Sequence, residues 1–418
     1  MKPKRMLKSK RALKRKQILK LRRALKQKQK LKPRRVLKHK QALKRRQALK
    51  PRRALKRRQA LRHNLILTLI NRIIMGIIIL FFVAVFSMRL LNQALFRLPN
   101  GVQEKVYVQL GDIDQFINIR GTSSENPVVI WLHGGPAAPD TFMTTTFQQE
   151  LESDYTFIRW DQRGCGRTYY KNKTAPISWE LLFSDLNELV DYASMRFGQP
   201  IVIVGHSWGS VLGSTYAAVY PEKIAGYIGV GQLTDFRESE KLATEEAIQR
   251  AYMAGNENDA VKILELYQSY ILGGKAVEKP TSKEFLQVEK LRQLTGAYLS
   301  PNGRDSTLTL LTSPDFGWND LRWQLRTKIN TESFYSLNQS LFTAMSIFSV
   351  PHAFEVPVVF LQGEHDYICS TALVQEYQNM VEAPRAEIFI MPELGHSPMI
   401  DDPVVFADTL KRALDIMI

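Results

Sequence analysis

The chain has 418 residues, a length that fits one large α/β domain with an insertion and terminal extensions. Its formal net charge of +18 is an uneven average, because residues 1–62 hold 30 of the 58 Lys and Arg residues and no Asp or Glu. The other 356 residues carry 28 basic and 40 acidic side chains, which excludes an evenly basic protein. The two cysteines, Cys165 and Cys369, permit at most one disulfide, and free thiols are favoured.

The basic arm, residues 1–62, repeats every six residues, with leucine at each sixth position from Leu7 to Leu61. On a helix a six-residue step turns the side chain by about 240°, so these leucines fall on three separate stripes. Pro33 and Pro51 interrupt a long helix further. The pattern predicts a disordered polycation that contacts anionic lipid or nonspecific polyanions, and the arm contains no aromatic residue for base stacking. A low-complexity extension without a specific role, or sequence upstream of the true start, fits the composition equally well.

An apolar segment at residues 65–88 follows the arm and predicts a transmembrane helix. Its uninterrupted part, Ile73 to Met88, extends to Leu65 if Arg72 reaches the membrane interface. Because basic flanks stay cytoplasmic, we expect a single-pass cell-membrane protein whose catalytic domain is extracytoplasmic. Cleavage near Ser87 to give a secreted enzyme, a cytoplasmic body and a buried core helix are the less favoured interpretations.

From about Val102 onward, short apolar runs alternate with helical patterns, which predicts a mostly parallel sheet covered by helices. Residues about 235–350 break this rhythm and predict an inserted helical cap, so that 102–234 and 351–418 form the α/β core. The expected strands are 104–110, 112–120, 128–132, 156–160, 201–204, 224–230, 356–362 and 386–391. The expected helices of the core are 178–197, 211–220, 372–381 and 404–417.

Ser207 lies in Gly205-His-Ser-Trp-Gly209, between a predicted strand and a predicted helix. Strand, G-x-S-x-G and helix together form a nucleophile elbow, a turn so tight that glycines are needed on both sides of the serine. The serine needs a general base and an orienting carboxylate, in the chain order Ser, Asp or Glu, His. Asp366 and His396 follow two predicted strands in that order, and we predict the catalytic triad Ser207, Asp366 and His396.

Other residues compete for these roles. Asp366 has the alternative of capping the helix near Thr371, and His396 that of a turn residue. The other candidate acids are Glu364 and Asp235, and the other candidate bases are His365, His352 and His206. The oxyanion hole needs two backbone N–H donors. We predict them at Trp208, the residue after the nucleophile, and at Gly135 in Trp131-Leu-His-Gly-Gly-Pro136, where the alternative is an ordinary Gly-Pro turn.

Four motifs resemble those of the proline iminopeptidase group of α/β hydrolases: His133-Gly-Gly-Pro136, Trp160-Asp-Gln-Arg-Gly-Cys-Gly166, Gly205–Gly209 and Gly395-His-Ser-Pro398. The resemblance covers roughly 105–418 and implies an α/β-hydrolase fold and removal of N-terminal residues, notably proline, from peptides. It also implies that Asp161 and Arg163 brace the floor of the active site.

Two positions depart from the family, Ala137 where glycine usually stands and His206 where a smaller residue is common. An aminopeptidase needs carboxylates for the substrate ammonium group. Glu238 and Glu240 are candidates at the start of the cap, with Glu245 and Glu246 nearby, although such a polar helical segment is more often a solvated face.

These observations predict a membrane-anchored serine hydrolase, an aminopeptidase of the proline iminopeptidase type, that needs no metal or organic cofactor. An esterase or small-amide hydrolase is the alternative. A membrane-tethered binding module on an inactive hydrolase fold, and a protein whose main function is polyanion binding by the arm, are the hypotheses from other classes. The oligomeric state is not predicted.

Overall fold

The computed structural model describes residues 3–272, 282–300, 307–325, 334, 337 and 345–418. Two compact units, Met1–Ala84 and Val85–Ile418, divide the chain. The prediction of free thiols agrees with the structure, in which Cys165 and Cys369 are both buried and unpaired.

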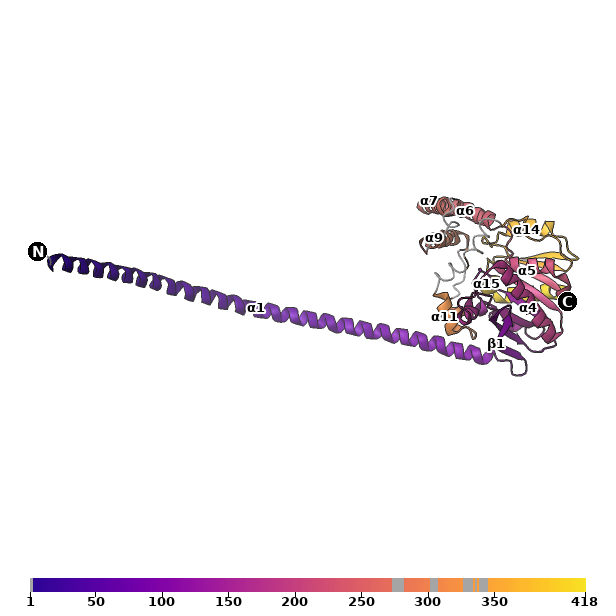
Figure 1. Cartoon of the computed structure of the whole chain (residues 1–418), viewed down its shortest axis with the longest axis horizontal. Helices are drawn as coiled ribbons and strands as arrows, with labels where there is room; N and C mark the ends of the chain where they lie inside the picture. The colour runs from indigo at the N-terminus through magenta and orange to yellow at the C-terminus, as the bar shows by residue number, and fades with distance from the viewer. Residues whose placement is uncertain (1–2, 273–281, 301–306, 326–333, 335–336, 338–344) are drawn as a thin grey trace. The chain divides into compact units, whose positions relative to one another are not determined.

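Helix α1 (Pro3–Leu95) contains both the basic arm and the apolar segment (Figure 1). The prediction of a disordered arm is therefore wrong in this structure, as is the expected interruption at Pro33 and Pro51. The physical reason is composition, since Leu, Ala, Lys, Arg and Gln, which make up most of the arm, are among the strongest helix formers. Within α1, His63–Leu95 is long and apolar enough to cross a bilayer.

The second unit contains an eight-stranded sheet in the order β1-β2-β4-β3-β5-β6-β7-β8. Strand β2 pairs antiparallel with β1 and β4, and every other pairing is parallel. The strands are β1 (Val102–Leu110), β2 (Ile113–Gly121), β3 (Val128–Leu132), β4 (Thr156–Trp160), β5 (Ile201–His206), β6 (Gly226–Val230), β7 (Val358–Gly363) and β8 (Ala386–Met391).

Helices cover both faces of the sheet, because the central parallel strands are buried on both sides. Alternate residues of β3 and β5 point to opposite faces, with Ile130 and Ile203 in one core cluster and Val129 and Val202 in the other. The first cluster packs against α4 (Trp179–Phe197), α5 (Trp208–Val219) and α14 (Thr371–Met380), and the second against α16 (Pro403–Met417). Shorter helices are α2 (Thr141–Thr144), α3 (Gly166–Lys171), α15 (Pro398–Asp401), η1 (Gln148–Glu150) and η2 (Pro221–Lys223).

Between β6 and β7 the described residues are mainly helical. Helices α6 (Phe236–Met253), α7 (Glu257–Leu266) and α9 (Ser282–Leu299), with the π-helical turn η3 (Tyr267–Leu272), share a hydrophobic core that includes Ile263 and Leu291. Figure 1 shows these helices grouped together, apart from α4 and α5. Two short helices, α10 (Thr307–Thr312) and α11 (Trp318–Gln324), follow before β7, and the remainder of the predicted cap lies largely outside the described residues.

Candidate active site

Ser207 occupies the tight turn between β5 and α5. Its backbone has φ 53° and ψ −122°, a conformation that side-chain-bearing residues rarely adopt and that costs on the order of 1–3 kcal/mol. A Cβ on Gly205 would lie 2.4 Å from the Gly209 carbonyl oxygen, and one on Gly209 would lie 2.3 Å from the Leu132 carbonyl oxygen. Both glycines are therefore required sterically, which explains why the elbow sequence can form this turn.

The elbow is tied to the end of strand β6. The Ser207 N–H donates to the Val230 carbonyl at 2.9 Å, and the next residue, Gly231, has φ 53°. A Cβ on Gly231 would lie 3.1 Å from Asp366 Oδ2 and 3.2 Å from His396 Nδ1. Gly231 therefore lies between the Ser207 turn and the Asp366–His396 pair. No motif in the neighbouring sequence indicates this position.

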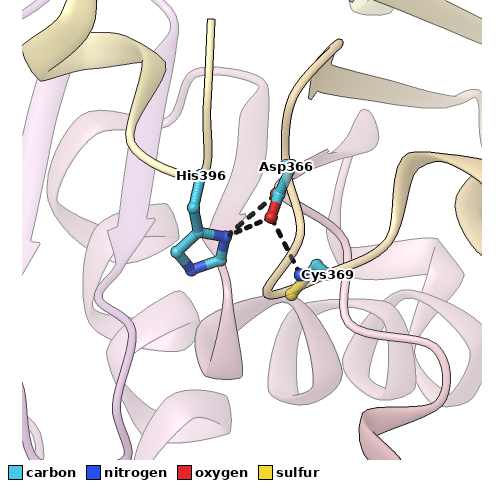
Figure 2. Close-up of side chains that lie close together, drawn as sticks. All are labelled: Asp366, Cys369 and His396. Carbon is cyan, nitrogen blue, oxygen red and sulfur yellow. Dashed lines mark hydrogen bonds and ion pairs between the residues drawn. The ribbon is translucent and has the colours of Figure 1, made fainter. Parts of the chain in front are cut away.

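Asp366 and His396 form a direct pair. Asp366 follows β7 and His396 follows β8, and Figure 2 shows their side chains pointing toward one another. His396 Nδ1 lies 2.9 Å from Asp366 Oδ2 and 3.1 Å from Oδ1. The Asp366 side chain is fully buried, whereas 16% of the His396 side chain is exposed. With Nδ1–H donating to the carboxylate, the Nε2 lone pair of His396 is free to accept a proton.

Backbone and side-chain donors hold the Asp366 carboxylate in place. Oδ1 accepts hydrogen bonds from the Ile368 N–H at 3.0 Å and the Cys369 N–H at 2.9 Å. Oδ2 accepts a bond of 3.0 Å from the Gln362 side-chain amide. These donors fix the orientation in which the Asp366 carboxylate accepts a hydrogen bond from His396 Nδ1.

Cys369 is a site residue that the sequence argument missed. Its sulfur lies within 4.8 Å of ligand-type atoms of both Asp366 and His396 (Figure 2). Burial raises the pKa of the Cys369 thiol, as does the charge of Asp366, while a hydrogen bond with the Ser207 side chain lowers it. The thiol therefore lies close to the Ser207 side chain as well as to the Asp366–His396 pair. Cys369 follows Asp366 by three residues on one tight turn, and this spacing is the sequence feature that could have indicated its position.

His206, the residue before Ser207, lies beside His396. Its Nε2 lies 3.0 Å from the His396 carbonyl oxygen, and the two imidazole rings are 5.1 Å apart. Burial, together with the charge of the neighbouring His396, lowers the pKa of His206 to about 3. A neutral His206 with a proton on Nε2 donates to that carbonyl and so positions the His396 loop.

The loop after β3 lies directly against the serine. A Cβ on Gly134 would be 3.1 Å from Ser207 Cβ, so a side chain here would force the loop or the serine to shift by a few tenths of an ångström. His133 supports the loop from inside, with Nδ1 donating to the Gly134 carbonyl at 2.8 Å and Nε2 accepting from the Gln162 N–H at 3.4 Å. Burial lowers the pKa of His133 to about 4, which keeps it in this neutral form.

The two predicted oxyanion donors, Trp208 and Gly135, lie in different local structures. Trp208 is the first residue of α5, and the N–H groups of the first helical turn have no acceptor within the helix. Gly135 has φ 123°, within the same glycine-rich loop as Gly134. Which of these loop N–H groups faces an oxyanion stays a prediction.

Asp161 and Arg163 make bracing contacts. The buried Asp161 carboxylate accepts from the Arg167 N–H at 2.7 Å, and burial raises its pKa. Arg163 Nε donates to Asp185 on α4 at 2.7 Å, and both side chains are fully buried. These contacts fix the loop after β4, as the resemblance implies.

The two carboxylates predicted to bind a substrate ammonium group are both ion-paired. Glu238 lies 2.7 Å from Lys241 Nζ on the surface of α6. Glu240 is largely buried and lies 3.1 Å from Arg292 Nε of α9. Ser239, between them, accepts a hydrogen bond of 3.2 Å from the Ser370 N–H, next to Cys369, so this part of α6 lies close to the site.

The competing candidates have other contacts. Asp235 caps α6 by accepting from the Glu238 N–H at 2.9 Å, and His365 lies 3.5 Å from the exposed Glu393. Glu364 accepts from the Glu393 N–H at 3.0 Å. These three residues, Glu364, His365 and Glu393, also bring ligand-type atoms within 4.8 Å of one another, but exposed groups of this kind are common without a metal.

The parallel sheet, the strained serine after β5 and the Asp–His pair after β7 and β8 define the α/β-hydrolase architecture. The chain belongs to the alpha/beta hydrolase family, whose model matches residues 129–409.

Named relatives are similar to the chain over different lengths. The probable aminopeptidase YbaC of Bacillus subtilis (strain 168) is 28% identical over 320 residues, which are 73% of this chain and 94% of the relative. The proline iminopeptidase of Neisseria gonorrhoeae is 31% identical over 124 residues, which are 29% of this chain and only 38% of that enzyme. Among solved structures, a membrane phospholipase A described as a bacterial virulence factor shares the fold, with a TM-score of 0.53 and 18% identity over 83% of this chain and 99% of its own.

Proposed function

We propose that the chain is a membrane-anchored serine hydrolase that acts as an aminopeptidase of the proline iminopeptidase type. The observation that carries the hydrolase assignment is Ser207 at φ 53°, bonded through its N–H to Val230 beside the Gly231 that contacts the Asp366–His396 pair. Residues 102–234 and 351–418 form the catalytic core in this proposal, and 235–350 form the cap over it.

The proposed reaction is acyl transfer through the serine. Ser207 Oγ attacks the substrate carbonyl while His396 Nε2 takes its proton, and Asp366 orients and stabilises the resulting imidazolium. Backbone N–H groups of Trp208 and Gly135 hold the oxyanion. His396 then gives the proton to the leaving amine, and a water molecule, activated by the same histidine, hydrolyses the acyl-enzyme.

The aminopeptidase specificity is supported by the relative YbaC, a probable aminopeptidase similar over most of both chains. In the proposal, Glu240 and Glu238 bind the substrate's α-ammonium group. Glu240 is the stronger of the two candidates, because it is largely buried and lies one residue from Ser239, which contacts the turn after Asp366.

The ion pairs of these carboxylates favour a second candidate function. A substrate ammonium group has to compete with Arg292 at Glu240 and with Lys241 at Glu238. An esterase or small-amide hydrolase needs no free carboxylate in the cap, so it stands as the alternative.

For localisation, we propose that residues 65–88 anchor the protein in the cell membrane, with the basic arm cytoplasmic. The catalytic unit, which comprises the proposed core and cap at residues 102–418, then lies outside. The support is the apolar stretch within His63–Leu95 and the charge asymmetry, since the 30 basic residues of 1–62 have no acidic counterpart. The arm then faces anionic lipid headgroups, where each basic residue near the surface contributes about 1 kcal/mol. Protease protection of the catalytic unit in intact cells would contradict this orientation.

A substrate panel tests the specificity. Pro-, Ala- and Leu-anilides, their N-blocked versions and short-chain esters are compared on the full chain in detergent. The aminopeptidase proposal expects blocking of the amine to abolish turnover, and equal rates on free and blocked anilides would leave the esterase or amide-hydrolase alternative.

Variants of the cap carboxylates sharpen that panel. Glu240→Gln should raise KM for free-amine anilides by about tenfold or more and leave ester hydrolysis unchanged, since a charged hydrogen bond contributes about 1.5–3 kcal/mol. Glu246→Gln is the matched control, because Glu246 lies on the same helix and pairs with Arg250 at 2.7 Å. Equal effects of the two variants would remove Glu240 from the substrate site.

A further inference from the structure

The last turns of α1 belong to the same compact unit as the sheet and are bonded to the segment from Thr312 to Phe316. Within residues 85–418, Arg89 donates to the Phe316 carbonyl, and the Asn92 amide donates to the Thr312 carbonyl at 2.9 Å. The Gln93 amide donates to the Pro314 carbonyl at 3.3 Å. Three carbonyls of the turn between α10 and α11 therefore bind side chains of the last turns of α1.

Phe96, three residues after Gln93, is buried in the catalytic unit. Its ring lies 4.2 Å beneath the Arg120 guanidinium, and Arg120 also donates to the Phe96 carbonyl at 2.7 Å. Arg120 in turn pairs with the buried Glu152 at 2.7 Å. These contacts join residues 89–96, which follow the apolar segment, to the catalytic unit.

The distances along the helix place this contact at headgroup depth. At about 1.5 Å of rise per residue, Arg89 and Asn92 lie about 2 Å and 6 Å beyond Met88, where the apolar run ends. The polar headgroup layer is about 5–8 Å thick on each side of the hydrocarbon core. The α10–α11 turn, bonded to both residues, then lies within that layer.

The same turn is flanked by exposed apolar side chains. Leu308, four residues before Thr312, is 59% exposed, and Trp318, two residues after Phe316, is 71% exposed. Trp318 is the most exposed of the six tryptophans, since Trp179 is half-buried and the other four are each exposed by 2% or less. Tryptophan is enriched at membrane interfaces because its ring has both an apolar body and a polar N–H.

We propose that α10 and α11 form a membrane-contacting surface, through Leu308 and Trp318, that holds the catalytic unit on the bilayer its own chain spans. The proposal rests on the membrane anchor proposed above and adds a second contact to it. Its position also bears on the reaction, because Trp323 of the same α11 donates to the Ala137 carbonyl at 3.0 Å, within the loop that carries Gly135. Helix α11 therefore contacts the proposed membrane surface through Trp318 at its start and the predicted oxyanion loop through Trp323 near its end.

Fluorescence quenching by brominated lipid tests the surface. The full chain is reconstituted into phosphatidylcholine–phosphatidylglycerol vesicles, with and without bromine on the acyl chains, and flotation after an alkaline wash measures insertion independently. We expect bromolipid to quench the wild-type tryptophan fluorescence and Trp318→Phe to lose at least half of that quenching. Loss of flotation would overturn the membrane anchor itself, and this surface with it.

Two added tryptophans in the Trp318→Phe background complete the test. Leu308→Trp should restore the quenching, whereas Met195→Trp on α4, a position that is 83% exposed, should not. Inserted protein in which Trp318→Phe is quenched as strongly as the wild type, or in which Met195→Trp restores quenching and Leu308→Trp does not, would overturn the proposal while leaving the membrane anchor intact.

Discussion

Replacing Gly231 by alanine tests its contact with the Asp366–His396 pair, and a control glycine separates that effect from backbone strain. The new Cβ would lie 3.1 Å from Asp366 Oδ2, 3.2 Å from His396 Nδ1 and 3.3 Å from His396 Cε1, so these side chains must retreat. Reaching an ordinary contact of 3.4 Å requires a movement of about 0.3 Å. A misplacement of 1 Å costs about 100-fold in rate, so 0.3 Å scales to about fourfold, and movement of both partners to about tenfold.

Gly198→Ala is the matched control. Gly198 ends α4 with φ 62°, close to the 53° of Gly231, and a Cβ there would meet nothing within 4 Å. Both variants should lose about 1–2 kcal/mol of stability from the left-handed backbone, measured by thermal or urea unfolding. We expect only Gly231→Ala to lower kcat, by about four- to tenfold on the best substrate of the panel. Equal kcat values for the two variants would refute the inferred contact between Gly231 and the Asp–His pair.

Three further variants probe the supports of the site. His206→Ala should lower kcat about tenfold with little change in KM, because it removes the hydrogen bond that positions His396, which is worth about 1.4 kcal/mol. His206→Gln should recover part of this loss. A change confined to KM would contradict the positioning of His396 by His206. For His133, the folded pKa of about 4 lies below the unfolded value of 6.5, so its contribution to stability is present above pH 6.5 and decreases as pH falls toward 4. Melting curves should therefore show the wild type losing stability between pH 6.5 and 4 relative to His133→Gln, and parallel curves would exclude this linkage. Gly209→Ala should prevent folding or shift the elbow, since its Cβ would lie 2.3 Å from the Leu132 carbonyl oxygen, and a fully active, equally stable variant would contradict that geometry.

Most of the sheet follows from local pattern. Strands 128–132, 156–160 and 386–391 have the predicted bounds, because each is a short apolar run delimited by polar or turn residues. Strand β5 continues two residues past the prediction, through Gly205 and His206, since the elbow begins only at Ser207. The order of Ser207, Asp366 and His396 along the chain was readable for the same reason: each follows the end of a strand.

Contacts between distant segments could not be read from the chain. Gly231 sits against Asp366 and His396 through the packing of β6 beside β7, and nothing in its neighbouring residues indicates this. The contact of His206 with the His396 carbonyl joins residues 190 positions apart. The ion pair between Glu240 and Arg292 depends likewise on how α6 and α9 pack.

The arm shows the opposite error, in which side-chain patterning was given more weight than backbone propensity. The six-residue leucine repeat does not build one apolar face, so amphipathicity predicts no helix there. Helix formation by Leu, Lys, Arg, Ala and Gln does not require such a face, and α1 runs through the whole arm.

The most direct test of the central claim is covalent labelling of the full chain by a fluorophosphonate, with the modified residue identified by mass spectrometry. We predict a single adduct on Ser207, absent in Ser207→Ala and formed much more slowly in His396→Ala. A folded wild-type protein that is not labelled, or labelling that persists in Ser207→Ala, would contradict the assignment of Ser207 as the nucleophile of this α/β hydrolase.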